Sequence, residues 1–342
     1  MSSSSFMKKT RSFMGFSALR NLVSDSMAID MGSASTIINV LGRGVVVDEP
    51  SIVAVNKATG EVLAVGSEAR QMQGREARDV SLIAPMVDGV VADFERTRAM
   101  LDYFVRKARS GISHFSRRAV MSVLSGVTQV EQRALLSAAA DAHIGRVYMV
   151  EEGLAAAIGA GVSIEDLRAS AVVDVGGATT NVAVVAQGAI IHAHAERTGS
   201  SDIDTAIIDR LRRHHGLAIG ANTAERLKLE MGSATPPQDS TLTMTVKGRE
   251  VQTGSPQATE VKVDEIYVVA QPVIRKIAQA VKDTLAELQP EVAADIYDRG
   301  LILTGGGAQL EGLAEYLNEE TLARQHRRRP ALCHRPRSGA TL

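Results

Sequence analysis

The sequence is poor in several residue types that mark particular classes of protein. It has a single cysteine, Cys333, no tryptophan, and only 3% aromatic residues. One cysteine excludes an intramolecular disulfide, and so few rings leave no stacking platform of the kind that single-strand nucleic-acid binders use. No apolar run reaches the ~18–20 residues that span a bilayer. Together these absences predict a protein of a reducing cytoplasm.

An excess of charge of either sign is also missing. The 38 basic and 39 acidic residues leave a formal net charge of −1. This balance excludes a protein-wide basic surface, so we expect no nucleic-acid partner. With 342 residues, of which 45% are hydrophobic, the chain can bury a sizeable core and is long enough for two lobes.

Two stretches of the chain share one pattern. Residues 28–40 and 171–185 each read as a strand, an acidic residue, a turn of small residues and a second strand. They align without gaps, and the matched pairs are Asp30 with Asp174, Gly32 with Gly176, Ala34 with Ala178, and Thr36 with Thr180. The repetition predicts two related half-domains that face each other across a polyphosphate.

The residue types in these hairpins suit a phosphate and a metal ion. Glycine and alanine allow successive backbone N–H groups to approach a phosphate closely. Asp30 and Asp174 add one carboxylate to each hairpin, and both can face a metal ion. The alternative is that both carboxylates only cap turns, and their paired context favours the metal.

Strands and helices alternate through the rest of the chain, which predicts an α/β fold. We expect a helix over 92–110 with one apolar face, and a helix opened by a capping box from Thr128 to Glu131. The expected apolar face consists of Met100, Leu101, Phe104, Val105 and Ala108.

Later parts of the chain carry turn and cap signals. We expect residues 48–50 to form a turn, helices to begin at Ser201 and Pro272, and a hairpin to turn at Lys247 and Gly248. Residues 300–304 should form a strand that runs through three glycines into a helix, where a ligand can meet backbone amides.

Six stretches match, in order, the motifs of one known family. They are IDMGSAST (29–36), DEPSIVAV (48–55), EEGLAAAIGAG (151–161), DVGGATTNVAV (174–184), TAERLKLEMGSA (223–234) and AADIYDRGLILTGGGAQL (293–310). Together they resemble the MreB family of bacterial, actin-like cell-shape proteins, including the Mbl paralogues. The resemblance runs from about residue 27 to about residue 320 and does not separate MreB from Mbl.

The resemblance implies an α/β, actin-like fold with two lobes, each with a duplicated α/β subdomain, around a central nucleotide cleft. The lobes would span 27–157 and 158–320, with small subdomains at about 46–77 and 194–257. It also implies ATP and Mg²⁺ as cofactors, weak ATP hydrolysis coupled to polymerisation, and filaments that bind the inner face of the cell membrane. There the filaments would scaffold the membrane proteins of cell-wall synthesis and elongation.

Motif by motif, the resemblance assigns roles to residues of this chain. Glu152 and Thr179 match the residues that orient the attacking water, and Asp30 and Asp174 match those that hold Mg²⁺ through water. The matches to nucleotide contacts are Gly32, Ser33, Ala34, Ser35, Gly176, Gly177, Ala178, Glu225, Arg226, Lys228, Gly305, Gly306 and Gly307. Without the resemblance, Glu152 reads as an ordinary acid in the first turn of a helix, and the 223–231 helix shows a solvated face.

Several positions depart from the family pattern. Gly153 replaces a proline and is expected to loosen the backbone that holds Glu152. Further replacements are Leu124 for a proline, Ala178 for a glycine, Asn181 for an acid, and Ser200 and Ser201 for Gly-Asp. None removes an amide of the phosphate loops, so we expect nucleotide binding to survive, whereas hydrolysis depends on the altered positions.

Two other functions stay open. A small-molecule kinase of the same superfamily would need a catalytic base and a substrate pocket, and the sequence offers no convincing candidate. A nucleotide-binding paralogue that no longer polymerises is the other alternative. A P-loop enzyme is excluded because the sequence has no G-x-x-x-x-G-K-[ST]. Phosphoryl transfer itself needs positioning and charge neutralisation, and the two amide-lined turns can provide the positioning.

Both ends of the chain differ from its body. Residues 1–26 form a basic amphipathic segment that can lie in a membrane interface; a disordered serine-rich tail and a misplaced start codon are the alternatives. Residues 321–342 form an atypical basic tail, with Arg327, Arg328 and Arg329 in a row, where the family continues with a strand and a helix. We favour a shifted reading frame over a tail that binds lipid or nucleic acid.

Overall fold

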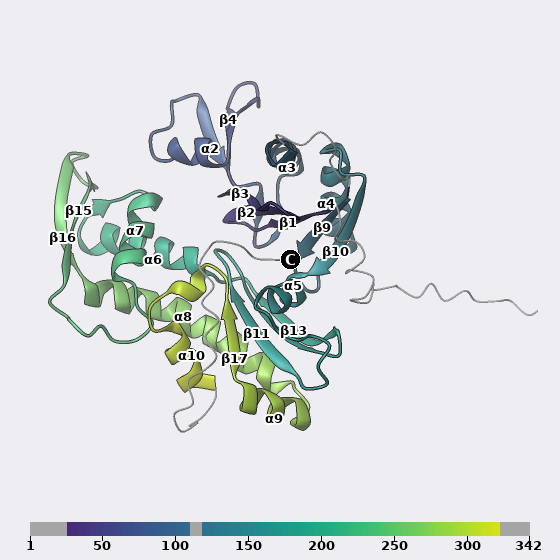
Figure 1. Ribbon diagram of the computed structural model, residues 1–342. Coiled ribbons are helices and arrows are strands. Elements are labelled where there is room, and N and C mark those ends of the chain that lie inside the picture. Colours follow the sequence, from purple (N-terminus) through teal and green to yellow (C-terminus); the bar gives the residue numbers. More distant parts are fainter. Residues whose placement is uncertain (1–25, 110–117, 322–342) are drawn as a thin grey trace, which may run out of the picture.

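The structure is a computed structural model that describes residues 26–109 and 118–321. These residues form two α/β lobes, each built around one main sheet, and helix α5 (Glu152–Gly159) lies between them (Figure 1). Helix α5 contacts strands of both main sheets. The two-lobed α/β organisation expected from the sequence is therefore present.

The first lobe contains a five-stranded sheet in the order β10-β9-β1-β2-β3. Its strands are β1 (Ser26–Met31), β2 (Ser35–Val40), β3 (Gly44–Pro50), β9 (Arg118–Val123) and β10 (Arg146–Glu151). Helices α3 (Phe94–Arg109) and α4 (Gln129–Asp141) share a core with this sheet. The predicted apolar face of α3 is fully buried, and α4 opens with the predicted capping box at Thr128 and Glu131.

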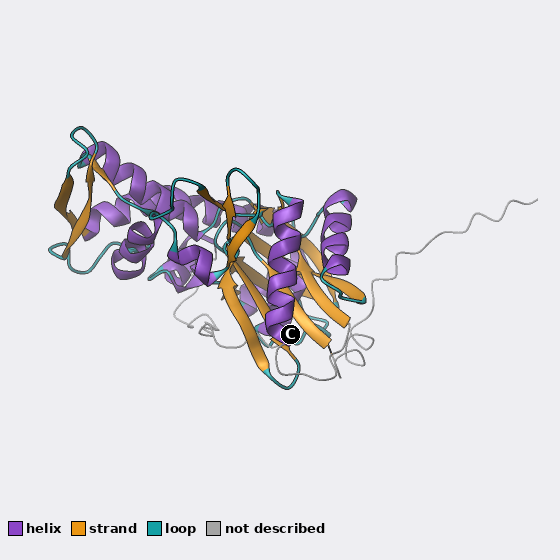
Figure 2. Cartoon of the chain, turned by 90° about the horizontal axis from the view of Figure 1, so that it is seen from above, coloured by secondary structure: helices purple, strands orange, loops and turns teal. Residues whose placement is uncertain are grey.

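The second lobe contains a four-stranded sheet in the order β13-β12-β11-β17. Its strands are β11 (Ser170–Val175), β12 (Thr180–Ala186), β13 (Ala189–Glu196) and β17 (Leu301–Thr304). The helices that pack with it are α6 (Ser200–His214), α7 (Ala221–Met231), α8 (Val263–Ala286), α9 (Pro290–Arg299) and α10 (Leu313–Thr321). Figure 2, a view from above, shows a group of helices that extends to one side of the main body of strands.

The two main sheets repeat one topology. In each, three antiparallel strands follow one another along the chain, β1-β2-β3 in one lobe and β11-β12-β13 in the other. The first strand of each trio then pairs in parallel with a strand from later in the chain, β1 with β9 and β11 with β17. The hairpin repeat seen in the sequence is thus the start of a duplicated sheet, and the two hairpins occupy equivalent places.

Two small sheets extend the lobes. The first consists of β4 (Val53–Asn56), β5 (Val62–Val65) and β6 (Val80–Ile83), with helix α2 (Ser67–Gln71) beside it. The second consists of β14 (Leu217–Ala218), β15 (Thr243–Glu250) and β16 (Pro256–Lys262). A short ribbon of β7 (Met86–Val87) and β8 (Val90–Val91) precedes α3. The lobe and subdomain boundaries given by the resemblance stay predictions.

Two predicted helix starts are wrong. Pro272 lies inside α8, which begins at Val263, because the buried apolar face of this long helix outweighs the hydrogen bond that a proline removes. Helix α6 begins at Ser200, so Ser201 is not its cap. The N-cap is Gly199, whose N–H donates to the Asp202 carboxylate at 2.8 Å.

Two predicted turns are also wrong. Residues 48–50 continue β3, because β2 pairs with this strand as far as Pro50. Lys247 and Gly248 lie within β15, and the chain turns after Glu250 instead. Gly248 is explained by packing, since a Cβ there would lie 2.5 Å from the carbonyl oxygen of Ala218.

No helix in the two described ranges combines the length and apolar character needed to cross a membrane. The basic N-terminal segment, apart from Ser26, and the tail from residue 322 lie outside the described residues.

Candidate functional site

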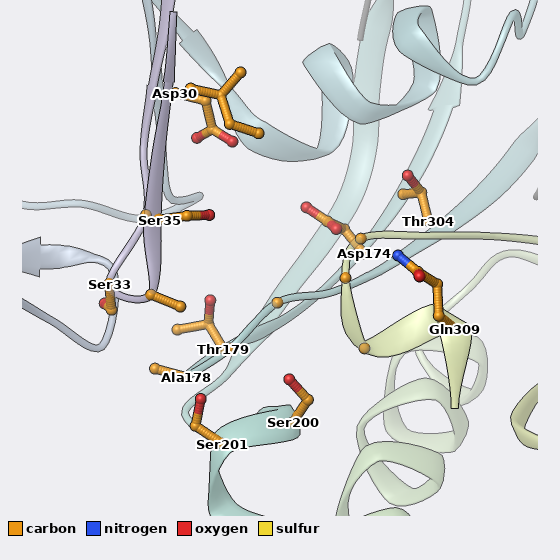
Figure 3. Close-up of a pocket in the computed structure, with 18 of the residues that line it drawn as sticks. Asp30, Ser33, Ser35, Asp174, Ala178, Thr179, Ser200, Ser201, Thr304 and Gln309 are labelled. Carbon is orange, nitrogen blue, oxygen red and sulfur yellow. The ribbon is translucent and has the colours of Figure 1, made fainter. Parts of the chain in front are cut away.

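A cavity of about 440 Å³ lies where the two lobes meet, and the turns of both hairpins line it. Figure 3 shows Ser33 and Ser35 of the first turn close to Ala178 and Thr179 of the second turn. The structure therefore brings the two predicted phosphate loops together around one space.

One hydrogen bond closes each turn in the same way. The Gly32 N–H donates to the carbonyl oxygen of Ser35 at 3.0 Å, and the Gly176 N–H donates to that of Thr179 at 2.8 Å. The turns also contact each other, because a Cβ on Gly177 would lie 2.4 Å from the Cβ of Ala34. A glycine at position 177 thus allows the two lobes to approach this closely.

Three predicted carboxylates line the cavity, namely Asp30 in β1, Asp174 in β11 and Glu152 at the start of α5. Ser122 Oγ donates to Asp30 Oδ1 at 2.7 Å, and Asn181 Nδ2 donates to Glu152 Oε2 at 2.7 Å. Strand β1 belongs to the sheet of the first lobe and β11 to the sheet of the second. The two aspartates therefore come from opposite lobes (Figure 3).

Burial raises the pKa of all three carboxyls. It raises the pKa of Asp30 despite the hydrogen bond from Ser122. Burial and the charge of Asp30 raise the pKa of Asp174 to about 7. Burial, followed by the charges of both aspartates, raises the pKa of Glu152 well above its usual range. Such a cluster holds its full negative charge at low cost only beside a cation.

These residues fit a hydrated Mg²⁺. Within residues 26–109 and 118–321 no three His, Cys, Asp or Glu side chains are placed to bind a metal directly. Two partly buried aspartates from opposite lobes, both on the wall of the cavity, instead suit an ion held through its own water molecules. The glycine-lined turns beside them leave room for phosphates close to the backbone.

A third wall of the cavity follows β17. Gly305, Gly306 and Gly307 line the cavity as predicted. Gly305 has a positive φ of 88°, and a Cβ there would lie 2.3 Å from Asp174 Oδ1, so this glycine lets the backbone pass the carboxylate. The expected helix does not follow directly, because a short 3-10 helix (Gly307–Gln309) intervenes before α10.

Two of the three residues that were predicted on helix α7 line the cavity. Glu225 and Lys228 line the cavity, whereas Arg226 is exposed and is not part of the lining. Lys228 is 8% exposed, and its Nζ donates to Asp204 at 2.8 Å and to the Ser200 carbonyl oxygen at 3.0 Å. This lysine therefore has its charge paired within the second lobe.

Glu225 is bound from the opposite lobe. Arg70 of α2 forms an ion pair with the Glu225 carboxylate, and its Nε donates to the Asn222 side chain at 3.1 Å. Helix α2 of the first lobe is thereby linked to helix α7 of the second lobe, where Glu225 lines the cavity. No local pattern announces this contact, since the arginine and the glutamate are separated by 155 positions in the sequence.

Sequence reasoning did not assign several other polar lining residues to the site. They are Asp48, Ser122, Asn181, Ser200, Ser201, Thr304, Gln309 and Glu311. Ser122 left a signal, because it is a polar residue in a strand that is otherwise largely apolar and buried. Its role still needed the pairing of β9 with β1, which places it beside Asp30.

The comparisons with known proteins agree on one family. The family model described as MreB/Mbl protein matches residues 24–333, so the match extends into the basic tail at residues 321–342. The cell shape-determining protein MreB of Escherichia coli strain K12 is 41% identical over 307 residues, 88% of each chain. The cell shape-determining protein Mbl of Bacillus subtilis is 39% identical over 294 residues, 86% of this chain and 88% of that protein.

Solved structures give the same result. MreB5 of Spiroplasma citri bound to ADP aligns with a TM-score of 0.81 and 31% identity, over 86% of this chain and 88% of that one. The same protein bound to AMPPNP aligns with a TM-score of 0.80 and equal coverage. A MamK double helical filament, 21% identical with a TM-score of 0.72 over 86% of this chain and 90% of its own, supports the fold alone.

Proposed function

This chain belongs to the MreB/Mbl protein family, and from that membership we propose that it forms ATP-dependent filaments on the inner face of the cell membrane. It is an actin-like cytoskeletal protein of the cell shape-determining class. As a membrane-bound filament it would scaffold the membrane proteins of cell-wall synthesis and elongation. The observation that carries the proposal is the pair of equivalent hairpin turns, one from each lobe, that line one cavity.

The cavity binds a nucleoside triphosphate through groups from both lobes. The backbone amides of the two hairpin turns hold the phosphates, and the wall at Gly305–Gly307 and helix α7 enclose the rest of the nucleotide. ADP and AMPPNP, the ligands of the related MreB5, are of this chemical class. Asp30 and Asp174 would hold Mg²⁺ through water, and this ion would supply positive charge beside the phosphates.

Slow hydrolysis follows from the same arrangement. Glu152 lies at the start of α5, where its carboxylate can accept a hydrogen bond from a water molecule in the cavity. Thr179, on the second turn, places a hydroxyl on the same cavity. These two residues orient water, and the remaining groups bind phosphate, so the protein acts by positioning.

Sedimentation with ATP and Mg²⁺, with and without anionic liposomes, tests this function. We expect ATP-dependent pelleting that increases with liposomes and disappears in Asp174→Ala, while the exposed control Asp79→Asn pellets like the wild type. A chain that binds ATP but stays in the supernatant under both conditions would be the non-polymerising paralogue. A chain whose melting temperature does not respond to ATP and Mg²⁺ would contradict nucleotide binding itself.

The ion pair between Arg70 and Glu225 should slow nucleotide release. It joins the two lobes at the edge of the cavity, so its loss makes opening easier. Both side chains are about one-third exposed, at 34% and 37%, so the effect is modest. We expect Arg70→Ala to release a fluorescent ADP analogue about 5-fold faster in stopped-flow measurements. Arg75→Ala removes an exposed arginine nearby, and equal release from the two variants would refute the link.

A further inference from the structure

The contact between β12 and α5 contains a side chain to which the proposed mechanism gives no role. Asn181 is 7% exposed and lines the cavity. Its Nδ2 donates to Glu152 Oε2 at 2.7 Å, which orients the amide with its oxygen away from the carboxylate. That oxygen is buried and has no hydrogen-bond donor among the described residues. A buried acceptor on the wall of a polar cavity is a site for a water molecule.

Close packing of α5 against β12 also fixes the position of Glu152. A Cβ on Gly153 would lie 2.2 Å from the Cβ of Ala183, so the glycine allows α5 to pack closely on β12. Asn181 and Ala183 are two positions apart in a strand and therefore project from the same face. One face of β12 thus holds the first turn of α5 at two adjacent points. Gly153, expected to loosen this backbone, is buried in a close contact instead.

The lack of charge on the Asn181 side chain matters because three carboxyl groups lie nearby. Glu152 already lies near Asp30 and Asp174, and the negative charges of these aspartates repel a negative charge on Glu152. A carboxylate at position 181 would add a fourth negative group that could only accept hydrogen bonds. The amide of Asn181 supplies a donor to Glu152 and adds no charge.

We propose that Asn181 is a positioning residue for hydrolysis: its amide fixes the Glu152 carboxylate, and its carbonyl oxygen holds a water molecule beside that carboxylate. This inference rests on the proposed function, because Glu152 is the group that orients the attacking water. It gives two departures from the family pattern, Gly153 of α5 and Asn181 of β12, one shared role.

Exchanging donor and acceptor tests the pair in nucleotide-free protein. In Asn181→Asp two carboxylates face each other, and we expect the melting temperature to fall by about 5 °C. Adding Glu152→Gln lets the new amide donate to the new carboxylate, so the double variant should recover most of that loss. Asn56→Asp makes the same substitution outside the cavity and should melt like the wild type. A double variant no more stable than Asn181→Asp would overturn the proposal.

Turnover then separates positioning from plain structural support. We expect Asn181→Ala to lower kcat for ATP by about 10- to 100-fold with the nucleotide Kd unchanged, because Asn181 lies outside the phosphate turns. The exchanged double variant should stay slow despite its recovered stability, since its carboxylate is on β12 rather than α5. Wild-type kcat in Asn181→Ala would refute the role. The melting comparison needs no nucleotide, so a failure of ATP binding in the wild type would count against the proposed function and not against this pair.

Discussion

Asp174→Asn is expected to raise the melting temperature of the nucleotide-free protein at neutral pH and to abolish its stabilisation by ATP and Mg²⁺. Both effects come from the one carboxyl of Asp174. Without a cation, burial and the charge of Asp30 disfavour the ionised form of Asp174, and asparagine removes that cost. With ATP and Mg²⁺, the same negative charge would help to hold the ion under the proposed function. At a nucleotide concentration of 100 times Kd, the variant would lose about 2.7 kcal/mol of stabilisation.

The pH dependence has a defined sign. The folded pKa of Asp174 is about 7, above its ordinary value of 3.8, so the folded protein binds this proton more tightly than the unfolded chain. The stability of the nucleotide-free wild type should therefore fall as the pH rises from about 4 to about 7, relative to Asp174→Asn. Thermal melts of both proteins across this range measure the difference. Asp79→Asn, which removes an exposed carboxylate, should follow the wild type, and parallel curves for Asp174→Asn would contradict the assignment.

Gly177→Ala is expected to weaken nucleotide binding by at least about 100-fold, because a 1 Å misplacement of positioning groups can have effects of that size. The added methyl would lie 2.4 Å from the Cβ of Ala34, and neither turn can yield without moving its backbone. The two phosphate turns would therefore separate. Isothermal titration with ATP and Mg²⁺ measures the loss.

A compensating change gives this prediction its control. Combining Gly177→Ala with Ala34→Gly exchanges the methyl between the two turns and removes the overlap, so binding should largely return. Gly220→Ala adds a methyl that would meet nothing within 4 Å and should bind like the wild type. If Gly177→Ala alone binds normally, the turns do not need this close approach.

Local sequence determined the elements whose signals lie within a few residues. The two hairpins follow from β-branched runs on either side of small residues, and the buried face of α3 follows from helical spacing. The capping box at Thr128 depends only on a residue three positions ahead. Pro272 and Gly248 were misread because the same residues that end elements locally are tolerated, or required, when tertiary packing surrounds them.

The candidate site likewise has a part that the sequence predicted and a part that only the tertiary structure showed. Both phosphate turns, with Asp30 and Asp174, could be predicted because the chain repeats them and because motifs resemble one family. For α7 the motif named three residues, and only the fold showed that Arg226 is exposed and does not line the cavity, whereas Glu225 and Lys228 do.

Contacts between distant residues required the tertiary structure. Asn181 meets Glu152, Ser122 meets Asp30, Gly177 meets Ala34, and Arg70 meets Glu225, each from a different element. No periodicity relates the members of such a pair, because the chain between them can take many paths before the sheets form. The sequence by itself determined which chemical groups this protein has and which turns present them. The packing of two duplicated sheets against α5 decided which groups touch, and so which of them can hold a charge, a water molecule or the opposite lobe.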